Sequence, residues 1–258
     1  MNQGKAGNLP AFVFCRKGAR KLRTERLVNG TAVFVDGAYR FGQDAMLLSA
    51  FCKVRWAERV CDLGTGCGII PLRWHDRGHR GPCYGVELQA GALALLKKAL
   101  AQGGMEHIVP VCADLRTWRP AEAGLFDVVC CNPPYFTGGR QSPDPARADM
   151  RHERTCTLED VCHTASELLR DGGRFCLCQR PERLADVMNA MRAARIEPKR
   201  LQFVAARPDR EPVLFLIEGH KNRAPGLRVL PVFITQREDR SPSDEILAVY
   251  GQKREEQS

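Results

Sequence analysis

The feature that most constrains this chain is the glycine-rich stretch at residues 60–70, with the sequence VCDLGTGCGII. Apolar residues precede three alternating glycines, and an apolar, helix-forming segment follows them. The pattern predicts a buried strand, a tight loop and a helix, the unit from which doubly wound α/β folds are built. Alternate glycines let the backbone bend sharply and let a ligand approach closely. The following helix would point its first amide groups at that ligand.

The spacing of the glycines indicates which class of ligand the loop fits. The stretch reads Asp62-x-Gly64-x-Gly66-x-Gly68, whereas a dinucleotide-binding loop reads G-x-G-x-x-G. We therefore predict that Gly64, Thr65, Gly66 and Gly68 form a cofactor-binding loop, and that its spacing opposes a nicotinamide cofactor. Asp62 is expected to orient this loop or to contact the cofactor. An Asx turn between Asp62 and the loop backbone is compatible with the orienting role.

Strand-like and helix-like segments alternate from residue 59 onward, as a parallel sheet with crossover helices requires. We predict an α/β fold with a doubly wound, mostly parallel sheet of seven strands. The strands are expected at 59–63, 83–87, 107–113, 126–131, 174–179, 199–204 and 213–217, with the last two as an antiparallel pair and a short edge strand at 229–234. The helices are expected at 68–75, 90–101, 157–169, which starts at Thr157 as N-cap, and 181–194.

A small extension precedes the α/β domain. The apolar residues 33–35 are followed by Asp36-Gly37, a strong tight-turn dipeptide, and therefore predict a β-hairpin within residues 27–41. A helix follows, and Asp44 suits its N-cap. We divide the chain into a basic arm (1–26), the hairpin and helix (27–55), the α/β domain (56–235) and a polar tail (236–258).

The charge of the chain favours a polyanionic partner. The net charge is +9 over 258 residues, a balance typical of many nucleic-acid-binding proteins. In the first 30 residues, seven Lys and Arg residues are opposed by Glu25 alone. No apolar run reaches membrane-spanning length and no signal peptide is recognisable, so we expect a cytoplasmic protein with no membrane partner.

The cysteines are interpreted as structural. Twelve are present, and none forms a C-x-x-C pair, so we predict no metal site and a reducing compartment. A thiol in a buried strand serves as a small apolar core group. The cysteines in the predicted strands are Cys61, Cys130, Cys131, Cys176 and Cys178.

Two carboxylates follow predicted strands beside the glycine loop. Glu87 closes the second strand, where an acidic side chain in this fold class accepts hydrogen bonds from ribose hydroxyls. An exposed strand-end carboxylate is the structural alternative. Asp114 follows the third strand and can accept from an adenine amino group, or it can cap the turn that it begins. We include the neighbouring Leu88 and Leu115 among the cofactor-contacting residues.

The stretch Asn132-Pro133-Pro134-Tyr135 ends the fourth strand. Two prolines fix the backbone, so the carbonyl groups there point in set directions. Asn132 Oδ1 and the Pro133 carbonyl can accept the two hydrogens of an exocyclic amine, which favours a pyramidal nitrogen with its lone pair aimed at a methyl donor. Tyr135 offers an aromatic face on which a flat substrate stacks. Such catalysis consists of positioning and oriented dipoles, whereas an ordinary Asn-Pro turn is the structural alternative.

Together, the glycine loop and the NPPY stretch resemble those of class I S-adenosylmethionine-dependent methyltransferases that act on amino groups of adenine, guanine or protein glutamine. The segment 41–48, Phe136 and the MRHE stretch at 150–153 narrow the resemblance to the tRNA(Val) adenine-37 N6-methyltransferase family. The resemblance implies S-adenosylmethionine as cofactor, contacted also by Asp44, Gln43 and Asn132. It implies methyl transfer to the N6 amine of an adenosine in tRNA.

The resemblance also implies RNA-facing charges. One set lies in the loop after NPPY, and a second set lies near the closing strands. A related methyltransferase acting on guanine in rRNA or on a release-factor glutamine, a noncatalytic RNA-binding protein and a nicotinamide oxidoreductase are the alternatives. The candidate RNA-facing residues are Arg147, Arg151, His152 and Arg154 in the loop, and Arg200, Arg207, Arg210, Lys221 and Arg223 near the closing strands.

Overall fold

In a computed structural model, the described residues are 22–120, 125–133 and 156–252. They form one large sheet with the strand order β10-β8-β9-β7-β6-β3-β4-β5, and β11 pairs with β8 beside this path. The strands of this sheet are β3 (Val60–Leu63), β4 (Cys83–Glu87), β5 (Ile108–Cys112), β6 (Phe126–Cys131), β7 (Leu169–Gln179), β8 (Ile196–Ala205), β9 (Leu214–Lys221), β10 (Arg228–Val229) and β11 (Phe233–Ile234).

The sheet confirms the predicted doubly wound α/β fold. All seven predicted strands are present, and β9 alone among these seven described strands runs antiparallel to its neighbours β7 and β8. The predicted edge strand at 229–234 is two separate short strands, β10 and β11, which both run parallel to β8. Because β3 to β6 are parallel, their carboxyl ends meet at one edge of the sheet.

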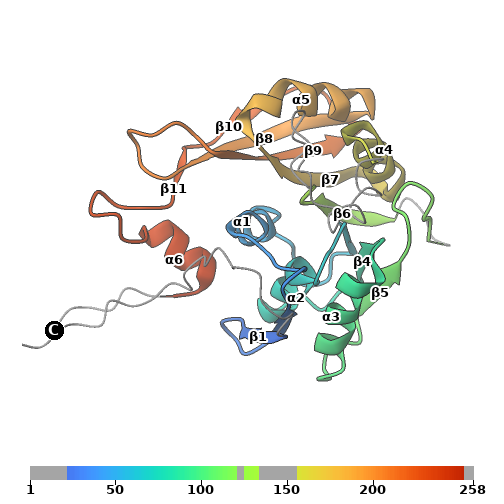
Figure 1. Cartoon of the computed structure of the whole chain (residues 1–258). Helices are drawn as coiled ribbons and strands as arrows, with labels where there is room; N and C mark the ends of the chain where they lie inside the picture. Colours follow the sequence, from blue (N-terminus) through green and yellow to red (C-terminus); the bar gives the residue numbers. More distant parts are fainter. Residues whose placement is uncertain (1–21, 121–124, 134–155, 253–258) are drawn as a thin grey trace, which may run out of the picture.

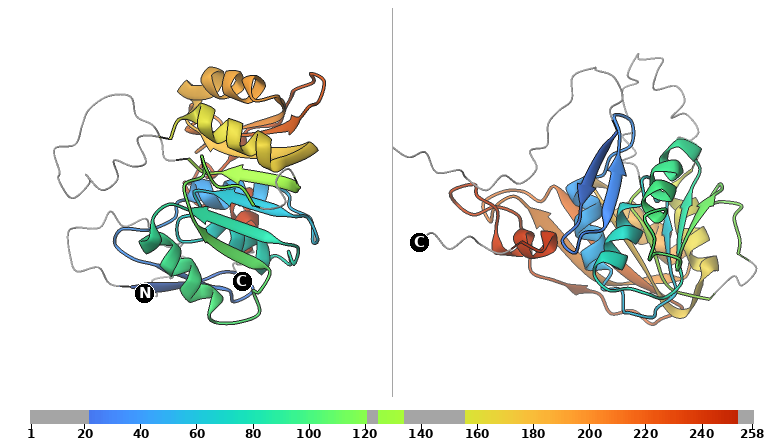
Figure 2. Two further views of the ribbon diagram at one scale, coloured as in Figure 1. Left: turned by 90° about the vertical axis from the view of Figure 1, so that its right-hand side faces the viewer. Right: turned by 90° about the horizontal axis from the view of Figure 1, so that it is seen from below.

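Helices cover both faces of the sheet (Figures 1 and 2). One core joins α1, α2 and α3 to side chains such as Val60 and Cys130, and the other joins α4 and α5 to side chains such as Val129 and Phe175. Successive residues of β6 thus face opposite cores, as the two-residue period of a strand requires. The helices are α1 (Gln43–Phe51), α2 (Ile69–Asp76), α3 (Ala90–Leu100), α4 (Leu158–Leu168), α5 (Leu184–Ala193) and α6 (Asp244–Tyr250).

The N-terminal hairpin is present, but its predicted turn is wrong. Strand β1 (Arg23–Arg26) pairs antiparallel with β2 (Ala32–Val35), so the chain reverses before β2, where Gly30 donates to the Leu27 carbonyl at 3.0 Å. The side chain of Asp36 instead accepts from the amides of residues 38 and 39. This Asx turn ends the strand without pairing it to the segment that follows.

The helix starts show one corrected and one confirmed cap. Gly42 is the N-cap of α1, and Asp44 lies within the first turn, so the predicted cap at Asp44 is wrong. The Asp44 carboxylate accepts from the amide of Ala45. Thr157 caps α4 as predicted, in a capping box with Asp160. That box satisfies two backbone donors at once and sets where α4 begins.

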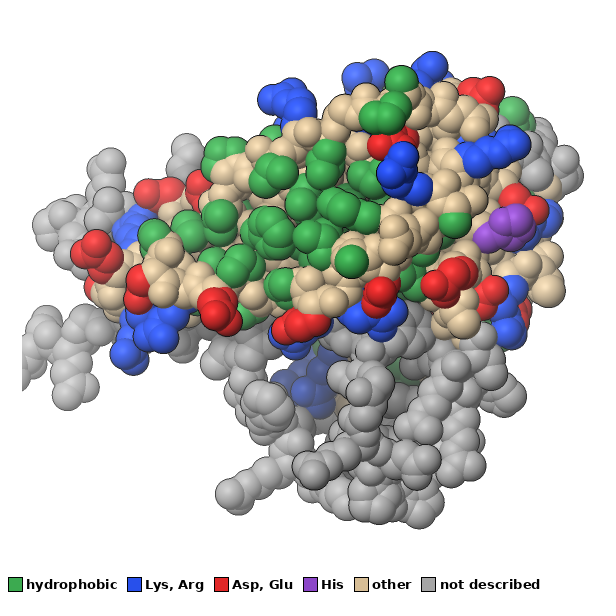
Figure 3. Space-filling view, turned by 90° about the horizontal axis from the view of Figure 1, so that it is seen from above, with side chains coloured by type: hydrophobic (Ala, Val, Ile, Leu, Met, Phe, Trp, Pro, Cys, Tyr) green, Lys and Arg blue, Asp and Glu red, His purple; other side chains and the backbone are tan. Residues whose placement is uncertain are grey.

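The outer end of the sheet lies at β8, β9 and β10. Figure 3 looks onto the upper face of the molecule and shows a group of hydrophobic side chains at its centre. Large hydrophobic side chains exposed in or beside these outer strands include Val213, Val229 and Val232. The other edge strand of the seven-stranded core is β5.

Candidate cofactor and amine site

An open cleft lies at the carboxyl ends of β3, β4, β5 and β6. It encloses about 710 Å³, including the solvent at its mouth. We call this side of the sheet the carboxyl edge. Seven predicted site residues line the cleft, namely Gly64, Glu87, Leu88, Asp114, Leu115, Asn132 and Pro133.

The glycine loop is attached to the neighbouring strand by its backbone. The amides of Gly64 and Thr65 both donate to the Val86 carbonyl, at 2.9 and 3.0 Å. Gly64 and Gly66 have φ values of +73° and +57°, and a Cβ added at either would meet no atom within 4 Å. These two glycines are therefore required for their backbone conformation, and they leave open space where a side chain would stand.

Gly68 has a different role from the other loop glycines. Its φ is +82°, and an added Cβ would lie 2.4 Å from Leu96 Cδ1. Leu96 is fully buried in α3, so Gly68 allows α2 to begin close against α3. Thr65 is also buried, at 4% exposure. Thr65, Gly66 and Gly68 thus support the loop, while Gly64 lines the cleft.

Glu87 connects the end of β4 to the glycine loop. Its Oε2 accepts from the Gly66 amide at 2.9 Å, and its Oε1 accepts from the Gln89 amide at 2.8 Å. Glu87 is 9% exposed and lines the cleft. The alternative of an exposed strand-end carboxylate is therefore wrong.

Asp114 both lines the cleft and caps its own turn. Its Oδ1 accepts from the backbone amide of Arg116 at 3.0 Å, and the Arg116 guanidinium pairs with the same carboxylate. Hydrogen bonding and charge from Arg116 lower the pKa of Asp114. The turn-capping role is therefore confirmed, and the contact with an adenine amino group stays a prediction. Arg116 itself lines the cleft, and no local sequence pattern marks it.

Asp62 lies beneath the loop and outside the cleft lining. It is 1% exposed, and its Oδ1 accepts from the Cys130 thiol at 3.2 Å. Burial raises the pKa of Asp62 to about 7, against the hydrogen bond from Cys130 that lowers it. The position fits the orienting role.

Asn132 and Pro133 stand together where β6 ends, and both line the cleft. The Asn132 side-chain oxygen accepts from the Cys178 thiol on β7 at 3.0 Å. Pro134 and Tyr135 lie outside the described residues, as do Phe136 and the loop that carries the candidate RNA-facing residues 147–154.

Asp44 approaches this region from α1. It does not line the cleft. Burial and, after it, the charge of Asp44 raise the pKa of the Cys178 thiol well above its ordinary value. Asp44 is thus an electrostatic neighbour of the thiol that contacts Asn132. Gln43, the first residue of α1, does not line the cleft either.

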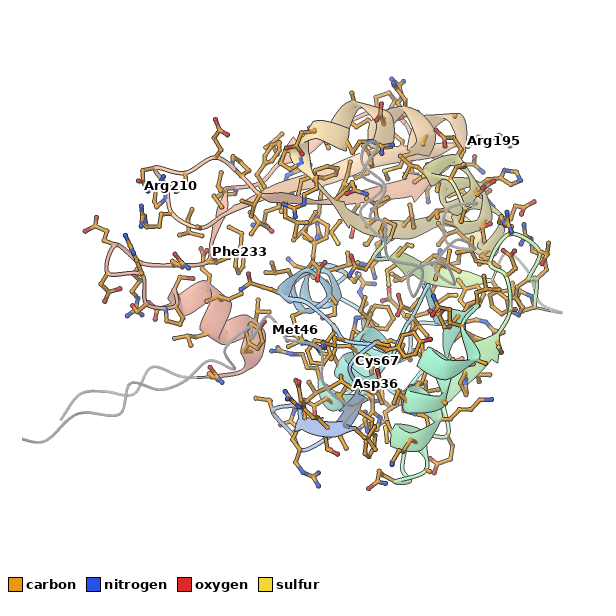
Figure 4. The ribbon with its side chains drawn as sticks, viewed as in Figure 1. Asp36, Met46, Cys67, Arg195, Arg210 and Phe233 are labelled. Carbon is orange, nitrogen blue, oxygen red and sulfur yellow. The ribbon has the colours of Figure 1, made fainter. Side chains whose placement is uncertain are left out.

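The predicted basic group near the closing strands does not gather at one place. Because β9 returns antiparallel along β8, Arg207 and Arg210 lie at one end of this strand pair, and Lys221 and Arg223 lie at the other. Figure 4 shows Arg210 and Arg195, which precedes β8, on opposite sides of the molecule. These residues therefore lie near the closing strands as predicted but do not form one basic surface.

Arg200 points into the structure. Its guanidinium donates to the Phe51 carbonyl at 2.9 Å, stands over the Phe51 ring and pairs with the buried Glu218 at 3.4 Å. Arg200 therefore joins β8 to α1 and β9, and its charge is paired with that of Glu218.

The cleft also contains residues that the sequence did not single out. Most are apolar strand-end or helix residues whose pattern is that of any core position. Their only signal is that each lies next to a predicted site residue or at the start of α4. They are Val86, Ala113, Arg116, Cys131, Cys156 and Val161.

The described residues hold neither a metal-binding group nor a membrane span. Across residues 22–120, 125–133 and 156–252, no three His, Cys, Asp or Glu side chains are placed to hold a metal ion. None of the helices in these ranges has the length and apolar character needed to cross a bilayer. Every cysteine within them is a free thiol.

Solved structures show the same fold. A structure described as a predicted O-methyltransferase from Agrobacterium tumefaciens has a TM-score of 0.65 at 20% identity, over 81% of this chain and 98% of that chain. Geranyl diphosphate methyltransferase in complex with SAM has a TM-score of 0.52 at 16% identity, over 69% of this chain and 84% of that chain.

Sequence relatives are closer. Over 142 residues, the chain is 30% identical to the tRNA1(Val) (adenine(37)-N6)-methyltransferases of Salmonella enteritidis and Salmonella typhi. The match covers 54% of this chain and 58% of each relative, so it spans under two thirds of these curated relatives. The methyltransferase small domain family matches residues 25–194, which is more than half of the 258-residue chain. The chain therefore belongs to the methyltransferase small domain family.

Proposed function

We propose that this protein transfers a methyl group from S-adenosylmethionine to the exocyclic N6 amine of an adenosine in tRNA, at position 37 of tRNA-Val or an equivalent site. The observation that carries the proposal is the cleft itself. It brings Asn132 and Pro133, two acceptors for an amine, together with Gly64 and Glu87 of the cofactor loop.

The residues of the cleft fit S-adenosylmethionine. The open space at the Cβ positions of Gly64 and Gly66 permits close approach of a ligand to the backbone. Glu87 retains acceptor capacity for ribose hydroxyls, because a carboxylate has about four lone-pair sites and two are used by backbone amides. Leu88 and Leu115 supply apolar walls for the adenine ring, and Asp114 supplies an acceptor for its amino group. When bound, the cofactor supplies an electrophilic methyl group.

The amine is activated by position. Asn132 Oδ1 and the Pro133 carbonyl accept its two hydrogens, and the nitrogen lone pair is thereby directed away from the ring and toward the methyl donor. The proton leaves during or after transfer, so no strong base is required. The catalytic contribution is orientation together with fixed dipoles. In this proposal Pro134 and Tyr135 keep the roles that the sequence assigns to them, which are to fix the backbone after Pro133 and to stack on the base.

The choice of tRNA adenosine is supported by the named relatives at 30% identity and by the basic charge of the chain. An adenosine must leave its stack to reach a cleft of this kind. Phosphate contacts from arginines and lysines would hold the RNA without selecting its sequence. Such an enzyme works where tRNA is found, in the cytoplasm.

Transfer of labelled methyl groups from S-adenosylmethionine to bulk tRNA, rRNA and total protein tests the proposal. Label recovered as N6-methyladenosine in tRNA is the expected result. Label in rRNA guanosine or in a protein glutamine overturns the substrate but keeps the amine chemistry. Cofactor binding without any label identifies a noncatalytic protein, and binding of NAD in place of S-adenosylmethionine overturns the cofactor.

The Asn132→Ala variant tests the role of the amide. We expect transfer to fall by about a hundredfold, the scale of losing one oriented hydrogen-bonding group at a reacting centre. Cofactor affinity measured by calorimetry should stay within about twofold, because Asn132 would be only one of several cofactor contacts, beside Gly64, Glu87 and Asp114. Asn189→Ala, an exposed position on α5, is the matched control. Equal loss of transfer and cofactor binding in Asn132→Ala would contradict this role.

A further inference from the structure

We propose that Cys178 is a positioning residue that fixes the orientation of the Asn132 amide. The inference rests on the proposed function, because it concerns the group that would hold the substrate amine. The inference is based on the distance of 3.0 Å between Cys178 Sγ and Asn132 Oδ1. Cys178 is fully buried.

The strand register brings these two residues together. In the parallel pair of β6 and β7, Cys130 stands beside Cys176 and Cys131 beside Leu177. One residue further along, Asn132 stands beside Cys178. Neighbouring residues on adjacent strands point to the same face of a sheet, so the two side chains meet where β6 ends.

The thiol distinguishes the two ends of the amide. An asparagine side chain can present either its oxygen or its NH₂ group after a half turn, and the two orientations have similar shape. The Cys178 S–H group donates to Oδ1. After a half turn the amide NH₂ would face the sulfur, which is only a weak acceptor, so the observed orientation is favoured. Oδ1 then keeps its second lone pair for a hydrogen of the substrate amine.

The thiol also stays protonated. Burial and the nearby charge of Asp44 raise the pKa of Cys178 well above its ordinary value. The donor is therefore present throughout the neutral range.

A second thiol acts in the same manner on the same face of the sheet. Cys130 Sγ donates to Asp62 Oδ1 at 3.2 Å. Both thiols lie in the core that joins the sheet to α1, α2 and α3. The interpretation of these cysteines as apolar core groups alone is therefore incomplete, because each also donates to a polar side chain beside the candidate site.

Steady-state kinetics of three variants test the proposal. Cys178→Ala removes the donor, and we expect kcat to fall about five- to tenfold, the scale of one neutral hydrogen bond. KM for tRNA and the Kd for S-adenosylmethionine should stay within about twofold. Cys178→Ser keeps a donor and should restore kcat to within about threefold of the wild type.

Cys176→Ala is the matched control. Cys176 is also fully buried on β7 and faces the same core, but its thiol points to Glu218 at 3.7 Å. We expect its kcat to match that of the wild type. Wild-type kcat in Cys178→Ala, or an equal fall in both alanine variants, would overturn the proposal, because the second result would mean that any cavity in β7 has the same effect.

A spectroscopic measurement makes the test independent of activity. The side-chain NH₂ resonances of Asn132 are assigned in ¹H–¹⁵N spectra by their loss in Asn132→Ala. They should move in Cys178→Ala and stay in place in Cys176→Ala. If the wild type methylates no substrate, the proposed function fails while these spectra still decide whether Cys178 orients Asn132. Unmoved resonances in Cys178→Ala would overturn the inference.

Discussion

Polar side chains are arranged differently at the two ends of the strands of the central sheet. At the carboxyl edge, Glu87, Asp114 and Asn132 converge on an open cleft. At the other end of the strands, which we call the amino edge, His75, His79 and His107 pack on one another. The rings of His75 and His107 stack with centroids 5.1 Å apart, and that of His79 lies 5.9 Å from His107.

Burial of titratable side chains alone does not distinguish the edge with the candidate site from the other edge. It raises the pKa of Asp62 to about 7 at the carboxyl edge, and with neighbouring positive charges it lowers the pKa of His107 to about 4 at the amino edge. Neither side chain lines the cleft. At these two residues a perturbed pKa marks desolvation, whereas acceptors that converge on open space mark the candidate site.

The largest expected effect is on the free energy of unfolding, and it is tested by replacing one glycine at each edge. Gly68→Ala should lower the free energy of unfolding by about 3 kcal/mol, because left-handed strain adds to overpacking against Leu96. Gly78→Ala, at the amino edge, has φ +98° and open space around its Cβ position. It should cost only about 1 kcal/mol, from strain alone. Urea denaturation measures both, and equal costs would mean that the contact with Leu96 is relieved without penalty.

The next effect is on the affinity for S-adenosylmethionine, and it is tested by replacing one acidic residue at each edge. Glu87→Ala should weaken S-adenosylmethionine binding about thirtyfold, the equivalent of ~2 kcal/mol for charge-assisted hydrogen bonds to the ligand. Glu106→Ala, beside His107 at the amino edge, should leave the affinity unchanged. Calorimetric titration checks both variants. Wild-type affinity in Glu87→Ala would remove this carboxylate from the proposed cofactor site.

The third comparison concerns the pH dependence of stability. His107 has a pKa of about 4 when folded and 6.5 in its ordinary state, so between these values the unfolded chain binds more protons. The contribution of His107 to stability therefore falls as the pH is lowered from 6.5 to 4. His107→Gln should show a shallower loss of stability than the wild type over this range, measured by denaturation at each pH.

Asp62→Asn is the control of opposite sign. Asp62 titrates at about 7 when folded and at 3.8 in its ordinary state, so its burial destabilises the protein increasingly as the pH rises from 3.8 to 7. Relative to the wild type, Asp62→Asn should therefore gain stability as the pH rises. For each variant, the measured quantity is its stability relative to the wild type as a function of pH. If this difference changes in the same direction in both variants, the assigned pKa shifts are contradicted.

Much of the fold and site follows from local sequence signals. The glycine loop, Glu87, Asp114 and Asn132 were found because each directly follows an apolar strand, and parallel strands bring such positions to one edge. Thr157 was found because its capping box is complete within four residues.

The remaining features depend on contacts between residues that lie far apart in the chain, and no local pattern predicts such contacts. Asp36-Gly37 has the chemistry of a hairpin turn, yet its side chain closes an Asx turn while β2 pairs with an earlier segment. The basic residues near the closing strands lie apart because β8 and β9 are long. Arg207 and Arg210 lie at one end of this strand pair, and Lys221 and Arg223 lie at the other. Cys178 meets Asn132 across 46 positions through the register of β6 and β7.

The two short strands beside β8 have a consequence for association between molecules. A ten-residue outer strand would otherwise offer a row of unpaired amides and carbonyls to another chain. Here β10 and β11 occupy two parts of that row, and Pro231 between them has no amide to donate. The cover itself is too short and too interrupted to template a further strand. This end of the sheet therefore resists edge-to-edge aggregation.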